Sequence, residues 1–363
     1  MPSMLSSRIN TAILVFIALT GVVIVAMLAT GVRGGPLDPP GPVAPTQSNV
    51  IYQPASCAAF PIVLSAPGAY RLGSNITGCV DKDGIRVTAS NVTLDLGGFS
   101  VIGVSGSLDG VKSVGAISLV SITNGNITGW GGDGLDVEST TASRIDRVSS
   151  MYNLLGALLG TGTVLSDSTV SRNYGDGINS QMTDVNVIRC KAEFNTYTGV
   201  ALVGEGAIVD GCVARGNGHN GILVGVSARV TNNHANYNTG SGIVASHSCY
   251  IENNSASWNT AEGYFVWNPG NCTVVRNKAT GNVRSGFNIY APAGYSLIDS
   301  NHASANGIYG FRLDAVTSGY PNIVTRNFAA GNSPLNYGIG ANNDAAPIVT
   351  AGAAVNPMSN ISQ

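Results

Sequence analysis

The chain has 363 residues, enough for one large domain or two ordinary ones, and its 44% hydrophobic content is sufficient for a core. Only 10% of the residues are Asp, Glu, Lys or Arg, against about 25% in a typical domain, while Gly alone contributes 47 residues. The net charge of −2 excludes the basic field that nucleic-acid binding requires, so no nucleic-acid partner is predicted.

The N-terminal segment, residues 1–33, predicts export. An almost unbroken apolar run from Ile9 to Val32 is expected to form a hydrophobic helix. Its length of about 20 residues can span a bilayer and exceeds the core of about 7–15 residues in an ordinary signal peptide. The small residues Ala29 and Gly31 also suit a cleavage site. A cleaved signal peptide and an uncleaved membrane anchor both stay open, so the protein is expected outside the cytoplasm, either secreted or held at the cell surface.

Residues 34–49 are predicted to form a linker. The stretch GGPLDPPGPVAPTQ, residues 34–47, has five prolines and no apolar periodicity. The folded region is expected over residues 50–339. Residues 340–363 are apolar and nearly uncharged, which favours a tail packed on the folded region.

A repeat with a frame of V-x-x-N-x-A-x-x-N-x-x-x-G fills the folded region. Eight consecutive copies of the second asparagine are spaced 22, 22, 21, 21, 23, 24 and 26 residues apart: Asn173, Asn195, Asn217, Asn238, Asn259, Asn282, Asn306 and Asn332. Weaker copies upstream, the first near Asn91, bring the total to about eleven turns.

Each repeat contains short segments of alternating apolar and polar residues, which predict strands of about three to five residues. Three such strands per repeat fit a coil in which every strand pairs in parallel with its copy one turn away. The sequence therefore predicts an all-β fold, a parallel β-helix. Stacked asparagines are expected to bond along the axis, and the residue after each glycine to point inward. The glycine column reads Gly177, Gly199, Gly221, Gly242, Gly263, Gly286 and Gly310.

Several segments resemble the exported bacterial right-handed parallel β-helix repeat proteins, which share their fold with the pectate lyases. These segments are SAPGAYRLGSNITG, ASNVTLDLGGFSVIG, GNITGWGGDGLDV and NYGIGANNDAAPIVTAGAAVNP. The resemblance extends from about residue 55 to the C-terminus. It implies a single right-handed β-helix and does not specify an activity.

The six cysteines predict disulfides, because the chain is predicted to be exported. Two pairs occupy equal places in adjacent turns, with Cα atoms expected about 5 Å apart and within bonding range: Cys190 with Cys212, and Cys249 with Cys272. Cys57 and Cys79 would then pin the N-terminal end. Buried free thiols are the alternative. No second ligand type joins any pair, so no metal site is predicted.

Residues one and three places beyond the inward position are predicted to stack into an outward stripe, acidic at one end, apolar in the middle and aromatic near the other end. The aromatic end offers flat rings for sugar faces and polar groups for hydroxyls, and predicts a glycan platform. Its residues are Phe265, Trp267, Asn288, Tyr290, Arg312 and Asp314. The alternatives are a cover formed by the C-terminal tail and a contact between copies of the chain.

The acidic end of the stripe is the catalytic candidate. Asp136 and Glu138 share one strand face, about 7 Å apart at their Cα atoms, and Asp133 lies in the preceding turn. Such a cluster could act as an acid/base pair, with Arg144 and Arg147 as the nearest cations, or hold Ca²⁺ in a lyase. Without lyase activity no cofactor is expected. Solvated turn residues are the structural alternative.

The histidines do not predict a metal centre. His234 and His302 share an outward column, but they are three turns apart, about 14 Å, and cannot share a metal. His219 and His247 lie elsewhere in the repeat. A likeness to periplasmic β-helix proteins of copper-site maturation is therefore not favoured.

Signature motifs of β-helix enzymes are also missing from the sequence. The DD pair of polygalacturonase-like hydrolases, the R-x-P-x-x-R of pectate lyases and the DPH of mannuronan epimerases do not occur. The sequence therefore favours a non-catalytic protein that binds polysaccharide or another cell-surface component. A polysaccharide lyase or hydrolase and a structural surface rod are the alternatives. A membrane contact through the N-terminal segment and an oligomer stay open.

Overall fold

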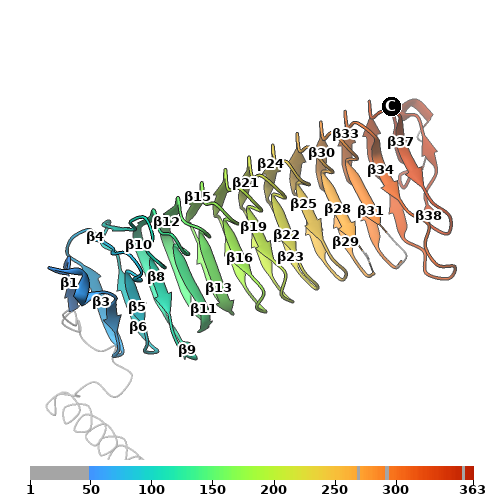
Figure 1. Cartoon of the computed structure of the whole chain (residues 1–363). Helices are drawn as coiled ribbons and strands as arrows, with labels where there is room; N and C mark the ends of the chain where they lie inside the picture. The colour runs from blue at the N-terminus through green and yellow to red at the C-terminus, as the bar shows by residue number, and fades with distance from the viewer. Residues whose placement is uncertain (1–48, 268–269, 291–293, 354–355) are drawn as a thin grey trace, which may run out of the picture. The chain divides into compact units, whose positions relative to one another are not determined.

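The computed structural model describes residues 49–267, 270–290, 294–353 and 356–363. Residues 48–363 form one compact unit, a right-handed parallel β-helix (Figure 1). The hydrophobic segment predicted at residues 1–33 lies outside the described residues. Among the described residues, no helix is long and apolar enough to cross a membrane.

One face of the coil is a fourteen-stranded sheet, called face B below. Its strand β9 (Ile117–Ser118) pairs beside β11. The other strands follow one another along the axis, one per turn: β2 (Ile62–Leu64), β5 (Ile85–Val87), β8 (Val111–Ser113), β11 (Leu135–Thr141), β13 (Ala157–Thr161), β16 (Ile178–Ser180), β19 (Val200–Leu202), β22 (Ile222–Val224), β25 (Ile243–Ala245), β28 (Tyr264–Trp267), β31 (Phe287–Tyr290), β34 (Tyr309–Leu313) and β37 (Leu335–Ile339).

The remaining strands form a 26-stranded sheet that contains two ladders. The ladders merge because two long strands run through both: β10 (Ser121–Thr128) and β12 (Arg144–Met151). The other members of the first ladder are β1 (Asn49–Ile51), β3 (Gly68–Leu72), β6 (Val92–Asp95), β14 (Val164–Ser166), β17 (Asn186–Ile188), β20 (Ile208–Asp210), β23 (Arg229–Thr231), β26 (Tyr250–Glu252), β29 (Thr273–Val275), β32 (Leu297–Asp299), β35 (Ile323–Thr325) and β38 (Asp344–Ala345).

The second ladder follows the first after a sharp bend in each turn. Its other members are β4 (Ile76–Thr77), β7 (Ser100–Ile102), β15 (Thr169–Ser171), β18 (Lys191–Glu193), β21 (Val213–Arg215), β24 (His234–Asn236), β27 (Ser255–Ser257), β30 (Lys278–Thr280), β33 (His302–Ser304), β36 (Phe328–Ala330), β40 (Asn360–Ser362) and β39 (Ile348–Val349). Two short 3-10 helices complete the described structure: η1 (Cys57–Ala59) and η2 (Ala351–Ala353).

The coil has about 13 turns, so the expected number of eleven was too low. The two turns that the sequence analysis missed contain β2 and β5, at the N-terminal end. They lack the paired asparagines by which the repeat was recognised. Parallel pairing does not require those side chains, because main-chain groups alone form the ladder.

The asparagine column is confirmed as a buried hydrogen-bond ladder. Asn195 Oδ1 accepts a hydrogen bond from the Asn173 amide at 2.9 Å and one from the Asn173 main-chain N–H at 3.1 Å. The same pair of bonds recurs from turn to turn as far as Asn332. Each amide also donates to a carbonyl oxygen of the preceding turn, as Asn195 does to Val170 at 3.2 Å. These buried polar groups are therefore satisfied within the coil.

The glycine column exists because the ladder leaves no room for a side chain. A Cβ atom on Gly199 would lie 2.6 Å from the amide nitrogen of Asn217 and 2.7 Å from the carbonyl oxygen of Gly221. The residue after each glycine points into the core, as predicted, and becomes aromatic towards the C-terminus. Tyr264, Phe287, Phe311 and Tyr337 stack with ring centroids 4.6, 4.8 and 5.2 Å apart.

The cysteines correct part of the sequence prediction. Cys57 and Cys79 form the predicted disulfide, whereas four cysteines are buried free thiols: Cys190, Cys212, Cys249 and Cys272. In-register parallel strands hold equivalent side chains pointing the same way about 4.8 Å apart, beyond the Cβ separation of about 3.5–4.5 Å in a disulfide. Cys212 Sγ instead accepts the main-chain N–H of Cys190 at 3.4 Å, as an asparagine oxygen does in the next turns.

The C-terminal tail closes the end of the coil. Its strand β38 pairs with β35, and β40 pairs with β36. Asn360 Oδ1 accepts hydrogen bonds from the Asn327 main-chain N–H at 3.0 Å and the Asn327 amide at 3.1 Å. The tail therefore extends the two ladders beyond the last turn of face B.

Candidate functional site

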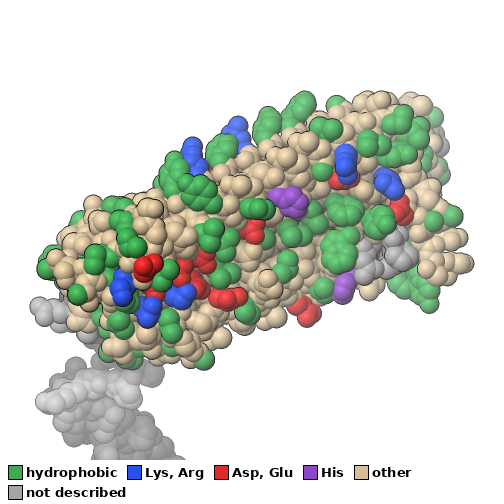
Figure 2. Space-filling view, viewed as in Figure 1, with side chains coloured by type: hydrophobic (Ala, Val, Ile, Leu, Met, Phe, Trp, Pro, Cys, Tyr) green, Lys and Arg blue, Asp and Glu red, His purple; other side chains and the backbone are tan. Residues whose placement is uncertain are grey.

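Face B presents the predicted outward stripe. Lys112 lies in register with Arg86 on one side and with Asp136 on the other, and Trp267 lies in register with Tyr290. Figure 2 shows acidic and basic side chains gathered over β5, β8 and β11, and hydrophobic ones over β25, β28 and β31. The two ends of face B therefore offer different chemistry.

The charged end of face B is a network of three turns, called the charged cluster below: Asp83, Arg86, Asp109, Lys112, Asp133 and Asp136. Lys112 Nζ lies 2.6 Å from Asp109 Oδ2 and 2.8 Å from Asp136 Oδ2. Arg86 pairs with Asp83 at 2.5 Å. The Asp133 main-chain N–H donates to Asp109 Oδ1 at 2.7 Å. Each basic group is thus neutralised by a carboxylate of its own or the next turn.

Within the charged cluster, Asp133 has a raised pKa. Burial, followed by the charges of Asp109 and Asp136, raises the pKa of Asp133 from 3.8 to about 7. Burial alone would lower the pKa of Lys112, but its hydrogen bonds to Asp109 and Asp136 raise it above the ordinary value. Lys112 therefore stays charged at neutral pH, while Asp133 exchanges a proton there.

The other sequence-predicted members of the acidic site are placed differently. Glu138 is half-buried on β11, and its main-chain N–H donates to Asp136 Oδ1 at 3.3 Å. Arg144 and Arg147 lie on β12, in the other sheet, and Arg147 pairs with Asp146 at 2.6 Å. The expectation that these arginines supply the cation was wrong, because the coil carries β12 onto another face. Lys112 of the preceding turn is the cation beside Asp136.

The sequence analysis missed Asp83, Arg86, Asp109 and Lys112. The signal was present, because Gly84 and Gly110 continue the glycine column and place these residues one position before and two after it. The repeat was recognised by its paired asparagines, and these first turns have only single ones, such as Asn75 and Asn91.

The aromatic end of face B keeps two of its predicted rings accessible. The side chains of Trp267 and Tyr290 are 47% and 50% exposed. Phe265 contacts Tyr290, with ring centroids 6.1 Å apart and planes at 49°. Next to Phe265 in register, Asn288 is buried, and its Oδ1 has no hydrogen-bond partner among the described residues. The Arg312 guanidinium nitrogen Nη2 lies 3.3 Å from Asp314 Oδ1.

The C-terminal tail does not cover these rings. Its strands β38 and β40 extend the two ladders, which form the other sheet. Trp267 and Tyr290 stay exposed with the tail in place, so the alternative of a tail that masks the aromatic end is wrong.

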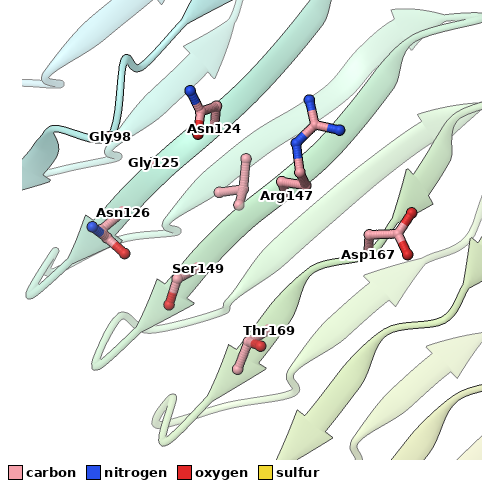
Figure 3. Close-up of a pocket in the computed structure, with 9 residues that line it drawn as sticks. Gly98, Asn124, Gly125, Asn126, Arg147, Ser149, Asp167 and Thr169 are labelled. Atoms are coloured by element: carbon pink, nitrogen blue, oxygen red, sulfur yellow. The ribbon is translucent and has the colours of Figure 1, made fainter.

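A shallow polar depression of about 330 Å³ lies at the bend between the first and second ladders (Figure 3). It is lined by Gly98, Asn124, Gly125, Asn126, Arg147, Val148, Ser149, Asp167 and Thr169. Asp167 is engaged by Arg189 at 2.6 Å, and this hydrogen bond lowers the pKa of Asp167. The depression contains no aromatic ring and no carboxylate with a raised pKa, so face B is the stronger candidate.

The chain was compared with known families and structures. A family model described as "Periplasmic copper-binding protein (NosD)" matches residues 161–344, and a model described as "Right handed beta helix region" matches residues 73–233. The first match covers about half of the chain. The chain belongs to the NosD family. No curated protein matches its sequence.

Solved structures similar to this NosD family member confirm the fold. The A-module of the mannuronan C-5 epimerase AlgE6 from Azotobacter vinelandii has a TM-score of 0.53 at 16% identity, over 81% of this chain and 91% of that one. A mutant of the periplasmic alginate epimerase AlgG has a TM-score of 0.53 at 13% identity, over 74% of this chain and 72% of that one. At such identities the likeness is one of fold alone.

The described residues do not provide a ligand set for the copper that the NosD family description names. Among the described residues, no three or more His, Cys, Asp and Glu side chains are grouped so as to hold a metal ion. The thiols of Cys190 and Cys212 donate to main-chain carbonyl oxygens instead. From the histidine positions, the sequence analysis did not favour such a family. That prediction was wrong, because the family model matches the repeat region.

Proposed function

We propose that this protein binds polysaccharide outside the cytoplasm and that the ligand lies on face B. The observation that carries the proposal is the exposure of Trp267 and Tyr290, side by side on adjacent turns of a rigid sheet. Flat rings held in this way offer apolar surface to sugar faces without a large loss of side-chain entropy on binding.

Polar groups beside the rings suit the hydroxyls of a glycan. Within the part of the chain that the structure describes, no donor bonds the buried Oδ1 of Asn288, and an acceptor of this kind gains from a hydroxyl that reaches it. The Arg312 and Asp314 pair on the next turn adds a donor and an acceptor. Aromatic surface with a few fixed polar groups is typical of specific ligand sites.

An extracytoplasmic location fits two observations. The family description names a periplasmic protein, and the disulfide between Cys57 and Cys79 is typical of an oxidising compartment. A polysaccharide at the cell surface or in the cell envelope is therefore the ligand class that the protein would meet, and surface adhesion the role that such binding would serve.

The test is binding of the protein to a panel of neutral and acidic polysaccharides, measured by gel retardation and calorimetry. Trp267→Ala and Tyr290→Ala should each weaken binding about tenfold, or ~1.4 kcal/mol. Tyr52→Ala is the matched control, since Tyr52 is 65% exposed and lies outside face B. Unchanged affinity in both face B variants, or an equal loss in the control, would contradict the proposal.

A second candidate function is a polysaccharide lyase or hydrolase, favoured by the charged cluster. Asp133 has a pKa raised to about 7, and the charged Lys112 is linked to it through Asp109, which bonds both the Asp133 main-chain N–H and Lys112 Nζ. A general acid or base is most effective when its pKa lies near the working pH. In this role Asp133 would move the proton, and Lys112 would offset negative charge on the substrate.

This second candidate predicts product formation from uronate or neutral polysaccharides, followed by ultraviolet absorbance of unsaturated ends and by reducing ends, with and without Ca²⁺. Asp133→Asn should abolish the product, while Asp344→Asn, an exposed carboxylate on β38, should retain it. If no substrate of the panel gave a product, the lyase or hydrolase function would be contradicted and the binding function would remain as the proposal.

A further inference from the structure

A second aromatic surface lies along the corner that ends the second ladder, where each turn of the chain leads to the next strand of face B. It consists of exposed side chains on successive turns, called the corner ridge below: Arg172, Phe194, Arg215, Tyr237 and Trp258. Figure 2 shows basic and hydrophobic side chains along the upper edge of the coil, where β15, β21 and β24 lie in Figure 1. Neither the repeat nor the face B proposal explains these residues.

The rings of the corner ridge are large and accessible. Phe194, Tyr237 and Trp258 are 47%, 56% and 55% exposed. Their main chain has φ values of 57°, 59° and 58°, in the left-handed region, which bulky residues seldom adopt and glycine adopts readily. Glycine does occupy this corner in other turns, as at Gly216 with φ 65°. Folding alone would be served by glycine, so the rings need another explanation.

The glycines of the same column hold two of the rings against the coil. A Cβ atom on Gly216 would lie 2.8 Å from the Phe194 ring, and one on Gly281 would lie 2.6 Å from the Trp258 ring. Each ring therefore rests on the bare backbone of the next turn. This contact fixes the rings while leaving about half of their surface in solvent, which makes them preformed platforms.

Basic side chains accompany the rings. The Arg172 guanidinium lies 5.4 Å from the Phe194 ring centroid, and that of Arg215 lies 5.3 Å from the Tyr237 centroid. Neither arginine forms an ion pair with a carboxylate of the described residues. Two turns separate them, about 10 Å along the axis. Phe194 and Tyr237 are thus each paired with a guanidinium group.

The charge of this surface differs from that of the chain. Strands β15, β18, β21, β24 and β27, each with the one residue that follows it, carry Arg172, Lys191 and Arg215 against one carboxylate, Glu193, whereas the whole chain has a net charge of −2. Asp176 and Glu262 lie further along the same corners, nearer to face B. A ligand of the corner ridge is therefore expected to be anionic, linear and flat-faced.

We infer that the corner ridge is a binding track for an acidic polysaccharide, with sugar rings on Phe194, Tyr237 and Trp258 and carboxylates on Arg172 and Arg215. A linear uronate chain carries a ring face and a carboxylate in every unit, which matches rings and guanidinium groups that recur along one axis. This track is separate from face B and does not depend on the function proposed there.

Ligand binding at the two surfaces can be measured separately by tryptophan fluorescence. The chain has three tryptophans: Trp258 on the corner ridge, Trp267 on face B and Trp130 buried in the core. Polygalacturonate oligomers are titrated into Trp267→Phe, whose changing emission reports Trp258, and into Trp258→Phe, which reports Trp267. We expect Trp258 emission to change with polygalacturonate and not with neutral dextran. Added salt should raise the Kd, since guanidinium contacts are screened.

Arg172→Gln combined with Arg215→Gln should raise the Kd read from Trp258 about tenfold and leave the Trp267 titration unchanged. Both side chains are exposed, and circular dichroism confirms that the variant is folded. Constant Trp258 emission with a responding Trp267 would overturn the track and retain the face B proposal. An equal response to dextran, or a dimer in light scattering that Trp258→Ala dissolves, would also overturn it, the latter in favour of a contact between two copies of the chain.

Discussion

At the scale of single residues, Asp133 differs from its carboxylate neighbours because no basic side chain of the described residues bonds to it. Asp109 and Asp136 share Lys112, whereas burial and these two charges raise the pKa of Asp133 to about 7. The folded chain therefore holds this proton more tightly than the unfolded chain does. The contribution of Asp133 to the free energy of unfolding is therefore fully present below pH 3.8, its ordinary pKa. This contribution is lost as the pH rises through about 7.

We expect Asp133→Asn to remove this pH dependence and to stabilise the protein at pH 8 relative to the native sequence. One pKa unit corresponds to about 1.4 kcal/mol, and screening at a partly exposed site reduces the total to about 2 kcal/mol. Urea unfolding of both proteins at pH 5 and pH 8 measures this change in the free energy of unfolding. Asp344→Asn should keep the native difference between the two pH values, and a native difference that persists in Asp133→Asn would show that another group is responsible.

At the scale of the elements, the asparagine ladder is the part of the fold that the sequence predicted best. The recurrence of Asn173 to Asn332 every 21 to 26 residues was sufficient, because stacked similar turns convert a sequence period into a spatial column. The same reasoning was wrong for Cys190 and Cys212, since equivalent positions of adjacent turns point two thiols the same way and hold them too far apart to bond. It also placed Trp267 outward correctly and missed Lys112, which lies in a turn without the paired asparagines.

Asn238 tests how much the ladder contributes. Replacement by Ala removes the acceptor of the Asn217 main-chain N–H and amide, each at 3.0 Å, and the donor to the Ala214 carbonyl at 3.1 Å. A buried polar group left unsatisfied costs about 1–3 kcal/mol, so we expect Asn238→Ala to lower the free energy of unfolding by about 3 kcal/mol. Urea denaturation monitored by circular dichroism measures the change.

Asn186→Ala serves as the control for the ladder. The Asn186 amide donates only to the nearby Asp184 carbonyl at 3.2 Å, at the surface, and its loss should cost about 0.5 kcal/mol or less. If both variants lost the same stability, the ladder would contribute no more than a surface hydrogen bond. The contrast separates the buried column from asparagine content as such.

At the scale of the whole molecule, a coil of parallel strands has two open ends, and each exposes main-chain groups that can pair with another molecule. The C-terminal end is closed by β40, which pairs through Ile361 with Phe328 of β36. Asn360 accepts from Asn327 and so ends a second asparagine column, parallel to the one from Asn173 to Asn332. Neither sequence period nor column position predicted this closure, because β40 follows the last repeat at a different spacing. Its placement depends on long-range pairing that composition does not encode.

Deletion of residues 357–363 tests the closure. The deletion uncovers the edge of β36, including the Asn327 N–H and the main-chain groups of Phe328, so we expect end-to-end association, seen as higher-mass species in light scattering at raised protein concentration. Asn360→Ala in the full chain is the matched control, since it retains the β40 backbone and removes only the side-chain bonds. That variant should lose stability and stay at the native mass. A truncated protein that also kept the native mass would show that β40 contributes to stability without protecting an edge.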